Sequence, residues 1–176
     1  FIHNGTLSAS TGRTGNAGAI SIDASTFNLA GEILAFTTSS GNGGSVDITS
    51  SNLSIDSGLI DVRSEDLGNA GSIIINAGLV SVSNLGEVNS SVLSGCTGQG
   101  GIITIDANAL ALVSGGALNT DTAGSGAGGT INFSVQNLLS VAGENSQINS
   151  NTTAAGSGGN IFGSAANIEL TSGGSI

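Results

Sequence analysis

The chain of 176 residues contains no lysine, proline, methionine, tryptophan or tyrosine, and only two arginines, one histidine and one cysteine. A single cysteine excludes a disulfide within the chain and a zinc site built on cysteines. Because twelve carboxylates give a formal charge of −10, the sequence cannot neutralise the phosphates of a nucleic acid or an anionic membrane surface. We therefore expect no nucleic-acid partner, and the acidic balance indicates a soluble protein rather than a particular site.

The sequence also lacks long apolar runs and an amphipathic helical period. No apolar run approaches about 20 residues, the length of a membrane-spanning helix, so we expect no membrane insertion. The absence of proline suits strands that pair along both edges, because proline cannot donate a hydrogen bond to a sheet. The sequence begins at Phe1 without an initiator methionine or a basic and apolar leader, which indicates a mature or excised part of a longer protein.

Glycine is abundant instead, with 30 residues, and much of it belongs to a motif that the chain repeats six times. The motif is clearest at residues 41–48, which read Gly-Asn-Gly-Gly-Ser-Val-Asp-Ile. Its first glycines are Gly15, Gly41, Gly68, Gly98, Gly126 and Gly156. Their mean spacing is about 28 residues, and a repeat of this length predicts a solenoid, a propeller or an array.

Three short apolar segments follow each motif, and their alternation with period two predicts β-strands. The first inward pairs are Ile20/Ile22, Val46/Ile48, Ile73/Ile75, Ile103/Ile105, Ile131/Phe133 and Ile161/Gly163. A second pair comes shortly after the first, as Leu53 and Ile55 do, and a third strand follows near Ile60 in the same repeat.

The third segment carries a small residue at its second inward position, which predicts a tapered corner of the core. These residues are Ala9, Ala35, Val62, Ser90, Thr120 and Ser150. Equivalent strands in successive repeats must be parallel, and parallel crossovers are right-handed in nearly all sheets. We therefore predict an all-β, right-handed parallel β-helix with three strands and about 28 residues per coil, and about six coils. Residues 1–176 are expected to form a single repeat segment within a longer solenoid.

Each glycine motif is expected to form a corner between two strands. A sharp corner needs either positive φ or close backbone approach, and glycine allows both. Asn16, Asn42 and Asn69 within the motif are suited to left-handed backbone. Cys96 lies in a glycine-flanked turn over residues 95–98, where we expect a free surface thiol.

The glycine corner is followed by the pattern Ile-x-Ile-Asp-Ala-x-x-Phe/Leu-x-Leu at residues 20–29 and 103–112. This combination resembles the repeat tracts of filamentous-haemagglutinin-like large exoproteins, which are two-partner-secretion proteins of Gram-negative bacteria, over nearly the whole chain from about Gly15. The resemblance implies export across the outer membrane and a long β-helical rod that serves as an adhesin or surface fibre. The amino-terminal secretion domain of that family is not visible among these residues, so the resemblance assigns this segment no part in the secretion step.

Polysaccharide lyases and pectinase-like hydrolases also use β-helices, and their chemistry needs paired carboxylates or carboxylates that bind a cation beside a basic group. Here the two arginines lie two repeats apart and the one histidine is alone near the start. Asp61, Glu65 and Asp66 are the densest acidic group, but Arg63 lies among them and we expect a solvated corner. We therefore expect no enzymatic activity and no cofactor.

A calcium-binding β-roll needs an aspartate directly after the glycines. That position holds Ser45, Ser72 and Thr130 here, so the motif is not met. One other group of oxygen ligands follows the first segment of successive repeats, and it consists of Asp23, Asp47, Asn76 and Asp106. We interpret these as a solvated face and expect no metal site.

Asn89, Asn119 and Asn149 each follow the first inward residue of a third segment. Their side chains should therefore point outward and stack about 4.8 Å apart on successive coils. We favour an amide ladder that stabilises the stack, and the alternative is a polar face that contacts glycans, for which these three are weak candidates. Ice binding would need a regular threonine array, but the neighbouring column reads Ser10, Phe36, Arg63, Ser91, Asp121 and Asn151.

These patterns lead us to expect a secreted, non-enzymatic rod at the outside or surface of a Gram-negative cell, with glycans or neighbouring or host cells as partners. The alternative is a self-assembling filament or surface-layer subunit, and a carbohydrate-active enzyme is third. Residues 5–7 and 174–176 occupy the same phase of the repeat, and neither end shows a cap. Open β-helix ends invite pairing, so we expect a continued solenoid or end-to-end stacking rather than an isolated monomer.

Overall fold

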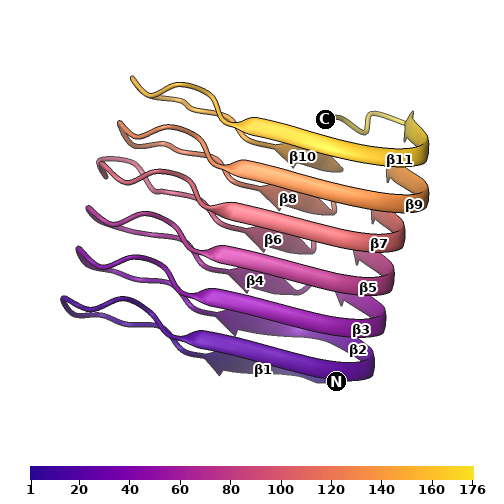
Figure 1. The fold of residues 1–176 in the computed structure, drawn as a ribbon, viewed down its shortest axis with the longest axis horizontal. Helices are drawn as coiled ribbons and strands as arrows, with labels where there is room; N and C mark the ends of the chain where they lie inside the picture. The colour runs from indigo at the N-terminus through magenta and orange to yellow at the C-terminus, as the bar shows by residue number, and fades with distance from the viewer.

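All residues from 1 to 176 are described by the computed structural model, and they form a stack of parallel β coils (Figure 1). The chain contains 11 strands, all of which belong to one sheet, and no helix. Successive coils wind in the right-handed sense from the N-terminal to the C-terminal end of the stack (Figure 1). The predicted all-β, parallel β-helix is confirmed.

Each coil contains a long strand, and the short strands stack beside one another on a second wall. The long strands are β2 (Ala19–Leu34), β3 (Ser45–Asp56), β5 (Ser72–Ser83), β7 (Ile102–Val113), β9 (Thr130–Ala142) and β11 (Asn160–Thr171). The short strands are β1 (Ile2–Ser8), β4 (Leu59–Asp61), β6 (Glu87–Asn89), β8 (Ala117–Asn119) and β10 (Gln147–Asn149). β2 joins the two walls, because its last residues pair with β4 while its first residues pair with β3.

The first and second predicted segments belong to one long strand that bends at a corner. The ladders between long strands skip one position at this corner, at Ser25, Ser51, Gly78 and Asn108. β9 has one residue more than β7, and the register shifts there between Ala107 and Ala109. A β-bulge accommodates one extra residue in this way. The two sides of the long strand and the short strand give the three sides of each coil.

The inward side chains form apolar columns with one residue from each coil. The main core holds 28 buried residues. Ile48, Ile75 and Ile105 pair in register and are fully buried, which confirms the register that the alternation predicted. Because burial of one such side chain contributes roughly 1.5–3 kcal/mol, these columns are the main source of stability.

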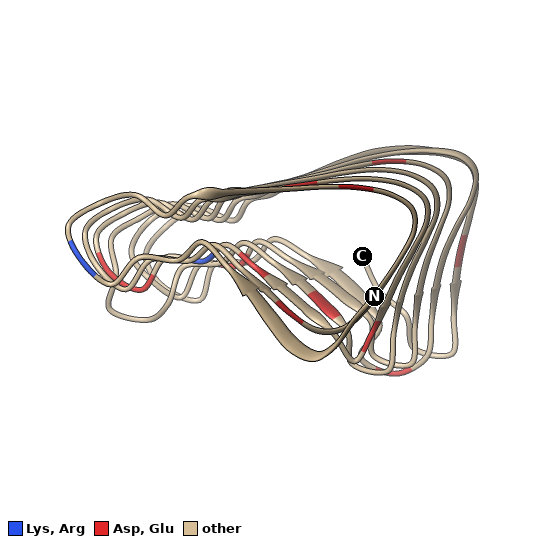
Figure 2. Ribbon diagram, turned by 90° about the horizontal axis from the view of Figure 1, so that it is seen from below, with Lys and Arg blue, Asp and Glu red and all other residues tan.

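Each coil is pinched into a three-sided main body and a flat side lobe (Figure 2). At the pinch, the last glycine of the motif donates a hydrogen bond to the small residue of the opposite wall. Gly44 N–H bonds to the Ala35 carbonyl at 2.7 Å, and Gly71 N–H bonds to the Val62 carbonyl at 2.8 Å. The predicted tapered corner is therefore the place where two walls of the coil meet. We define the side lobe as residues 9–18, 35–44, 62–71, 90–101, 120–129 and 150–159.

The side lobe has an interior that differs from the main core. Isolated parallel bridges stack one residue per coil along it, at Thr11, Thr37, Ser64, Val92, Thr122 and Thr152. Thr37 and Thr122 are fully buried, and the Thr122 hydroxyl donates to the Ala127 carbonyl at 2.9 Å. Ser64 is also fully buried, but its hydroxyl has no hydrogen-bond partner in the protein. A hydrogen-bonded hydroxyl can be buried at little cost, so the lobe is held by polar contacts as well as by a small apolar cluster.

The motif glycines are required because successive coils approach closely, not because of positive φ. A Cβ on Gly41 would overlap the carbonyl oxygen of Gly15, and a Cβ on Gly68 would overlap that of Gly41. The motif glycines have no positive φ. Positive φ is found instead at the turn between the long and short strands, at residues such as Ser57 and Asn84.

The first and last coils expose apolar side chains of the kind that the middle coils bury. Phe1 and Leu7 are 79% and 41% exposed at one end, and Ile168 and Leu170 are 50% and 48% exposed at the other. The apolar cross-section of the core is therefore open at both end faces.

Candidate binding surfaces

The column of Asn89, Asn119 and Asn149 lies on the wall of short strands, in the predicted register. All three side chains are half-buried. Asn89 Nδ2 donates to Asp61 Oδ1 at 3.2 Å, and Asn119 Nδ2 donates to Glu87 Oε1 at 2.7 Å. These amides are bonded to carboxylates rather than to each other, so the column is not a simple amide ladder.

Asp61 takes the place of an asparagine at the same register position, next to Asn89. It is fully buried, so the expectation of a solvated corner is wrong for this residue. Arg63 forms ion pairs with Asp61 and with Glu65, and its guanidinium lies 4.7 Å from the centre of the Phe36 ring. A buried carboxylate is tolerated when a cation and hydrogen bonds compensate its charge, and the Arg63 guanidinium, the Arg63 backbone N–H and Asn89 Nδ2 do so for Asp61. Arg63 is paired with the carboxylates of both Asp61 and Glu65. A hydrolase needs a free acid and a free base instead.

The oxygen ligands considered for a metal do not converge. Asp23, Asn76 and Asp106 lie in one column, in which Thr49 stands between Asp23 and Asn76. Asp47 belongs to a different column, beside Ile74. No three acidic, histidine or cysteine side chains come together in a way that could hold a metal ion.

Cys96 lies inside the side lobe and not on its surface, which corrects the expectation of a surface thiol. It is 6% exposed and packs in a small cluster with Ala70 and Val92. Burial raises the pKa of the Cys96 thiol, and the nearby carboxylates of Asp66 and Glu65 raise this pKa further. The thiolate is the reactive form of cysteine, so this environment makes the group less reactive.

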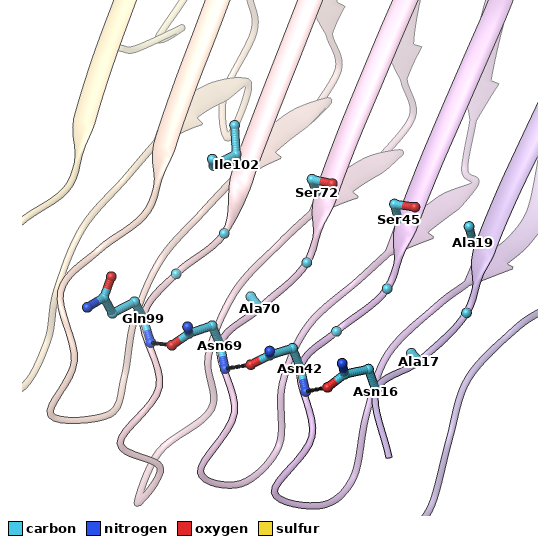
Figure 3. Close-up of a pocket in the computed structure, with 16 residues that line it drawn as sticks. Asn16, Ala17, Ala19, Asn42, Ser45, Asn69, Ala70, Ser72, Gln99 and Ile102 are labelled. Atoms are coloured by element: carbon cyan, nitrogen blue, oxygen red, sulfur yellow. Dashed lines mark hydrogen bonds between the residues drawn. The ribbon is translucent and has the colours of Figure 1, made fainter.

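A shallow groove runs across four coils where the side lobe meets the long strands (Figure 3). Its volume is about 600 Å³, and none of its 16 lining residues is charged. The side chains along its floor are mostly hydrogen, methyl or hydroxymethyl groups, as at Gly44, Ala19 and Ser72. We call this feature the amide groove, because a row of side-chain amides follows its length.

The amides of the groove are fixed by the neighbouring coil. Asn42 N–H donates to Asn16 Oδ1, Asn69 N–H to Asn42 Oδ1 and Gln99 N–H to Asn69 Oδ1, each at 2.9 Å (Figure 3). None of these three asparagines has positive φ, so the expected left-handed role is wrong. They recur because each side-chain oxygen satisfies a backbone N–H one coil later. The repeated motif shows in the sequence that these amides recur. It does not show their hydrogen-bond partners, because each partner lies in the next repeat.

No known protein-family model matches the chain, and neither a curated protein nor a solved structure gives a match. The structure has no helix that is long and apolar enough to cross a membrane.

Proposed function

We propose that this chain is a rod segment of a secreted, filamentous-haemagglutinin-like exoprotein of a Gram-negative cell, which acts in adhesion or as the scaffold of a surface fibre and catalyses no reaction. The proposal is carried by the stack of about six coils, in which each long strand pairs in parallel with the long strand of the next coil, from β2 to β11. Such a stack grows by about 4.8 Å per coil at constant width, which is the geometry of a fibre.

The distribution of polar groups supports a structural and adhesive role. Apart from the buried Asp61, the acidic residues are spread around the coils (Figure 2), and no three of them come together in a group that could hold a metal ion. In the densest acidic cluster, Asp61 and Glu65 are both paired with Arg63. The surface that remains for a partner is therefore an extended one, along the rod, rather than a deep pocket.

The open end faces support the same role. Apolar side chains such as Ile168 and Leu170 lie half-exposed there, in columns that are buried in the middle coils. We propose that further β coils cover both faces in the working rod, because an uncovered β edge with an apolar core invites pairing.

A self-assembling filament is the second candidate, and the same end faces favour it. A second copy whose β2 continued the ladder of β11 would, however, meet a steric conflict. Ile2 shares a column with Leu170, and Thr6 shares one with Ser175, so both copies would place residues in the same layer. Stacking of this kind requires one of the two segments to move aside.

Immunogold labelling of the source cells with an antibody raised against residues 1–176 tests the proposed location. We expect label on the outer surface or on fibres shed from it, and loss of the label after protease treatment of intact cells. Cells that lack the gene should attach less to surfaces or to other cells. Label confined to the cell interior would contradict the proposal.

A further inference from the structure

We propose that the amide groove binds an uncharged linear polysaccharide that lies along the axis of the rod. The groove crosses four coils and is open along its length, so it fits a polymer better than a compact ligand. This inference names the class of partner and the residues that contact it. Its biological role, in adhesion, rests on the proposed function.

The row of amides offers one hydrogen-bond donor group per coil. Because Asn16, Asn42 and Asn69 each use Oδ1 to accept a backbone N–H, their NH₂ groups must point away from that bond. No protein acceptor takes these NH₂ groups, which therefore remain available to a ligand. They recur at the coil spacing of about 4.8 Å, so a linear polymer that lies along the axis would meet one donor group per coil.

The hydrogen bonds also hold the donors in place before a ligand arrives. A side chain that is already fixed loses little rotamer freedom on binding, which favours affinity. One amide binds a sugar hydroxyl only weakly, but a polymer engages several at once, so its overall affinity rises without any new kind of contact.

The chemistry of the groove separates an uncharged glycan from other polymers. Its lining has no arginine, which a nucleic acid or an acidic polysaccharide would need to compensate its charge, and the chain carries −10 overall. A peptide strand would need unpaired backbone groups to pair with. Here the backbone is already used, since Ala17, Gly43 and Ala70 each donate to the carbonyl of the next coil at 2.9–3.0 Å. The groove thus presents donors to a ligand that is rich in neutral acceptor oxygens.

The Asn89, Asn119 and Asn149 column is less suited to this role. Its amides at Asn89 and Asn119 already donate to Asp61 and Glu87, so their donor capacity is partly used. The groove therefore replaces this column as our candidate for glycan contact.

The test is affinity electrophoresis of the 176-residue chain through gels that contain hydroxyethylcellulose, mixed-linkage β-glucan, galactomannan or polygalacturonate. The test variant is N16D/N42D/N69D, in which an Asp oxygen still accepts the N–H of the next coil but the NH₂ donor is gone. The matched control is N28D/N52D/N76D, which places the same added charge on exposed positions of the same coils. A thermal melt of each protein shows whether it is folded. The single variant N42D keeps the test valid if the triple variant fails to fold.

We expect at least one uncharged polysaccharide to retard the native chain and the control, and polygalacturonate to retard neither. The groove variant should bind about tenfold more weakly or worse, and N42D should show a smaller loss with an unchanged melt. Absence of retardation by every uncharged polymer, equal losses in groove variant and control, or preferential binding of polygalacturonate would each overturn the inference. A surface-exposed rod that binds no glycan would sink this inference alone, whereas an intracellular protein that binds glycans would sink only the proposed function.

Discussion

The ring of Phe133 occupies space that the next coil would otherwise use. A Cβ placed on Gly163 would overlap the Cζ and both Cε atoms of this ring. The other inward positions of this column hold isoleucines such as Ile75 and Ile105, so a large ring in one coil is matched by glycine in the next. This pair shows how a solenoid corrects an irregular residue in the neighbouring repeat.

This match predicts a strong coupling between the two positions. Gly163→Ile should destabilise the chain by about 1–3 kcal/mol, because it overpacks the column against the ring. Phe133→Ile together with Gly163→Ile should recover most of that loss, since the column becomes regular. Urea unfolding of both single variants and the double variant measures the coupling, and strictly additive effects would show that the two side chains do not compete for one space.

The thiol of Cys96 provides a second test at the residue scale. Its pKa is raised by burial first and then by Asp66 and Glu65, so the folded chain holds the thiol proton more tightly than the unfolded chain does. The associated stability is therefore fully present below the pKa of the unfolded thiol and is lost as pH rises through the higher folded value. We expect iodoacetamide to modify Cys96 more slowly in the native chain than in urea at mildly alkaline pH. Asp66→Asn should speed the native reaction, and equal rates in buffer and urea would contradict the burial.

At the scale of the strands, the aliphatic columns carry most of the stability. Ile75→Ala should cost about 2–5 kcal/mol, because the site lies between Ile48 and Ile105 and cannot collapse. Ile74→Ala is the matched control, since its side chain is 39% exposed on the outer face of the same strand. Asn89→Ala should also cost less, about 1 kcal/mol, through loss of its bond to Asp61. Thermal melts that rank Ile75→Ala as the mildest of the three would contradict the register.

The sequence was sufficient to predict the columns but not the side lobe. Wherever a coil encloses an apolar core, period two appears in the sequence, as it does at Ile73 and Ile75. The interior of the lobe contains hydroxyls such as Thr37 and Thr122, and these leave no apolar period to recognise. The corner within each long strand was predicted as a gap between strands, because local alternation cannot tell a bend from a break.

The parts of the candidate site that were missed all depend on contacts between coils. Asp61 is buried because Arg63 turns back over it and also lies against Phe36 of the preceding coil. The amides of Asn16 and Asn42 are fixed by backbone groups one coil later. The repeat shows that such residues recur, but their roles follow only once the coils are stacked in register.

At the scale of the whole molecule, the outer walls and the end faces have opposite characters. Apart from the buried Asp61, the acidic residues are spread around the coils (Figure 2), and a charge of −10 disfavours contact between the flanks of two copies. The end faces instead present half-exposed apolar residues such as Leu7 and Leu170. Association of this chain with itself should therefore run along the axis.

We predict that the 176-residue chain does not persist as an isolated monomer at micromolar concentration, and that association uses the end faces. Sedimentation velocity should show species that grow with concentration, and Ile168→Lys with Leu170→Lys should reduce them, because the charges would be buried at the junction. Ile74→Lys changes a side chain on the outer wall and should leave these species unchanged.

Deletion of residues 1–7 should favour longer assemblies, since it removes the segment that would share a layer with residues 170–176 of another copy. A single monomeric species with a high melting temperature at every concentration would refute the prediction. If the deletion left the assemblies unchanged, the end faces would be joined in some way other than a continued ladder.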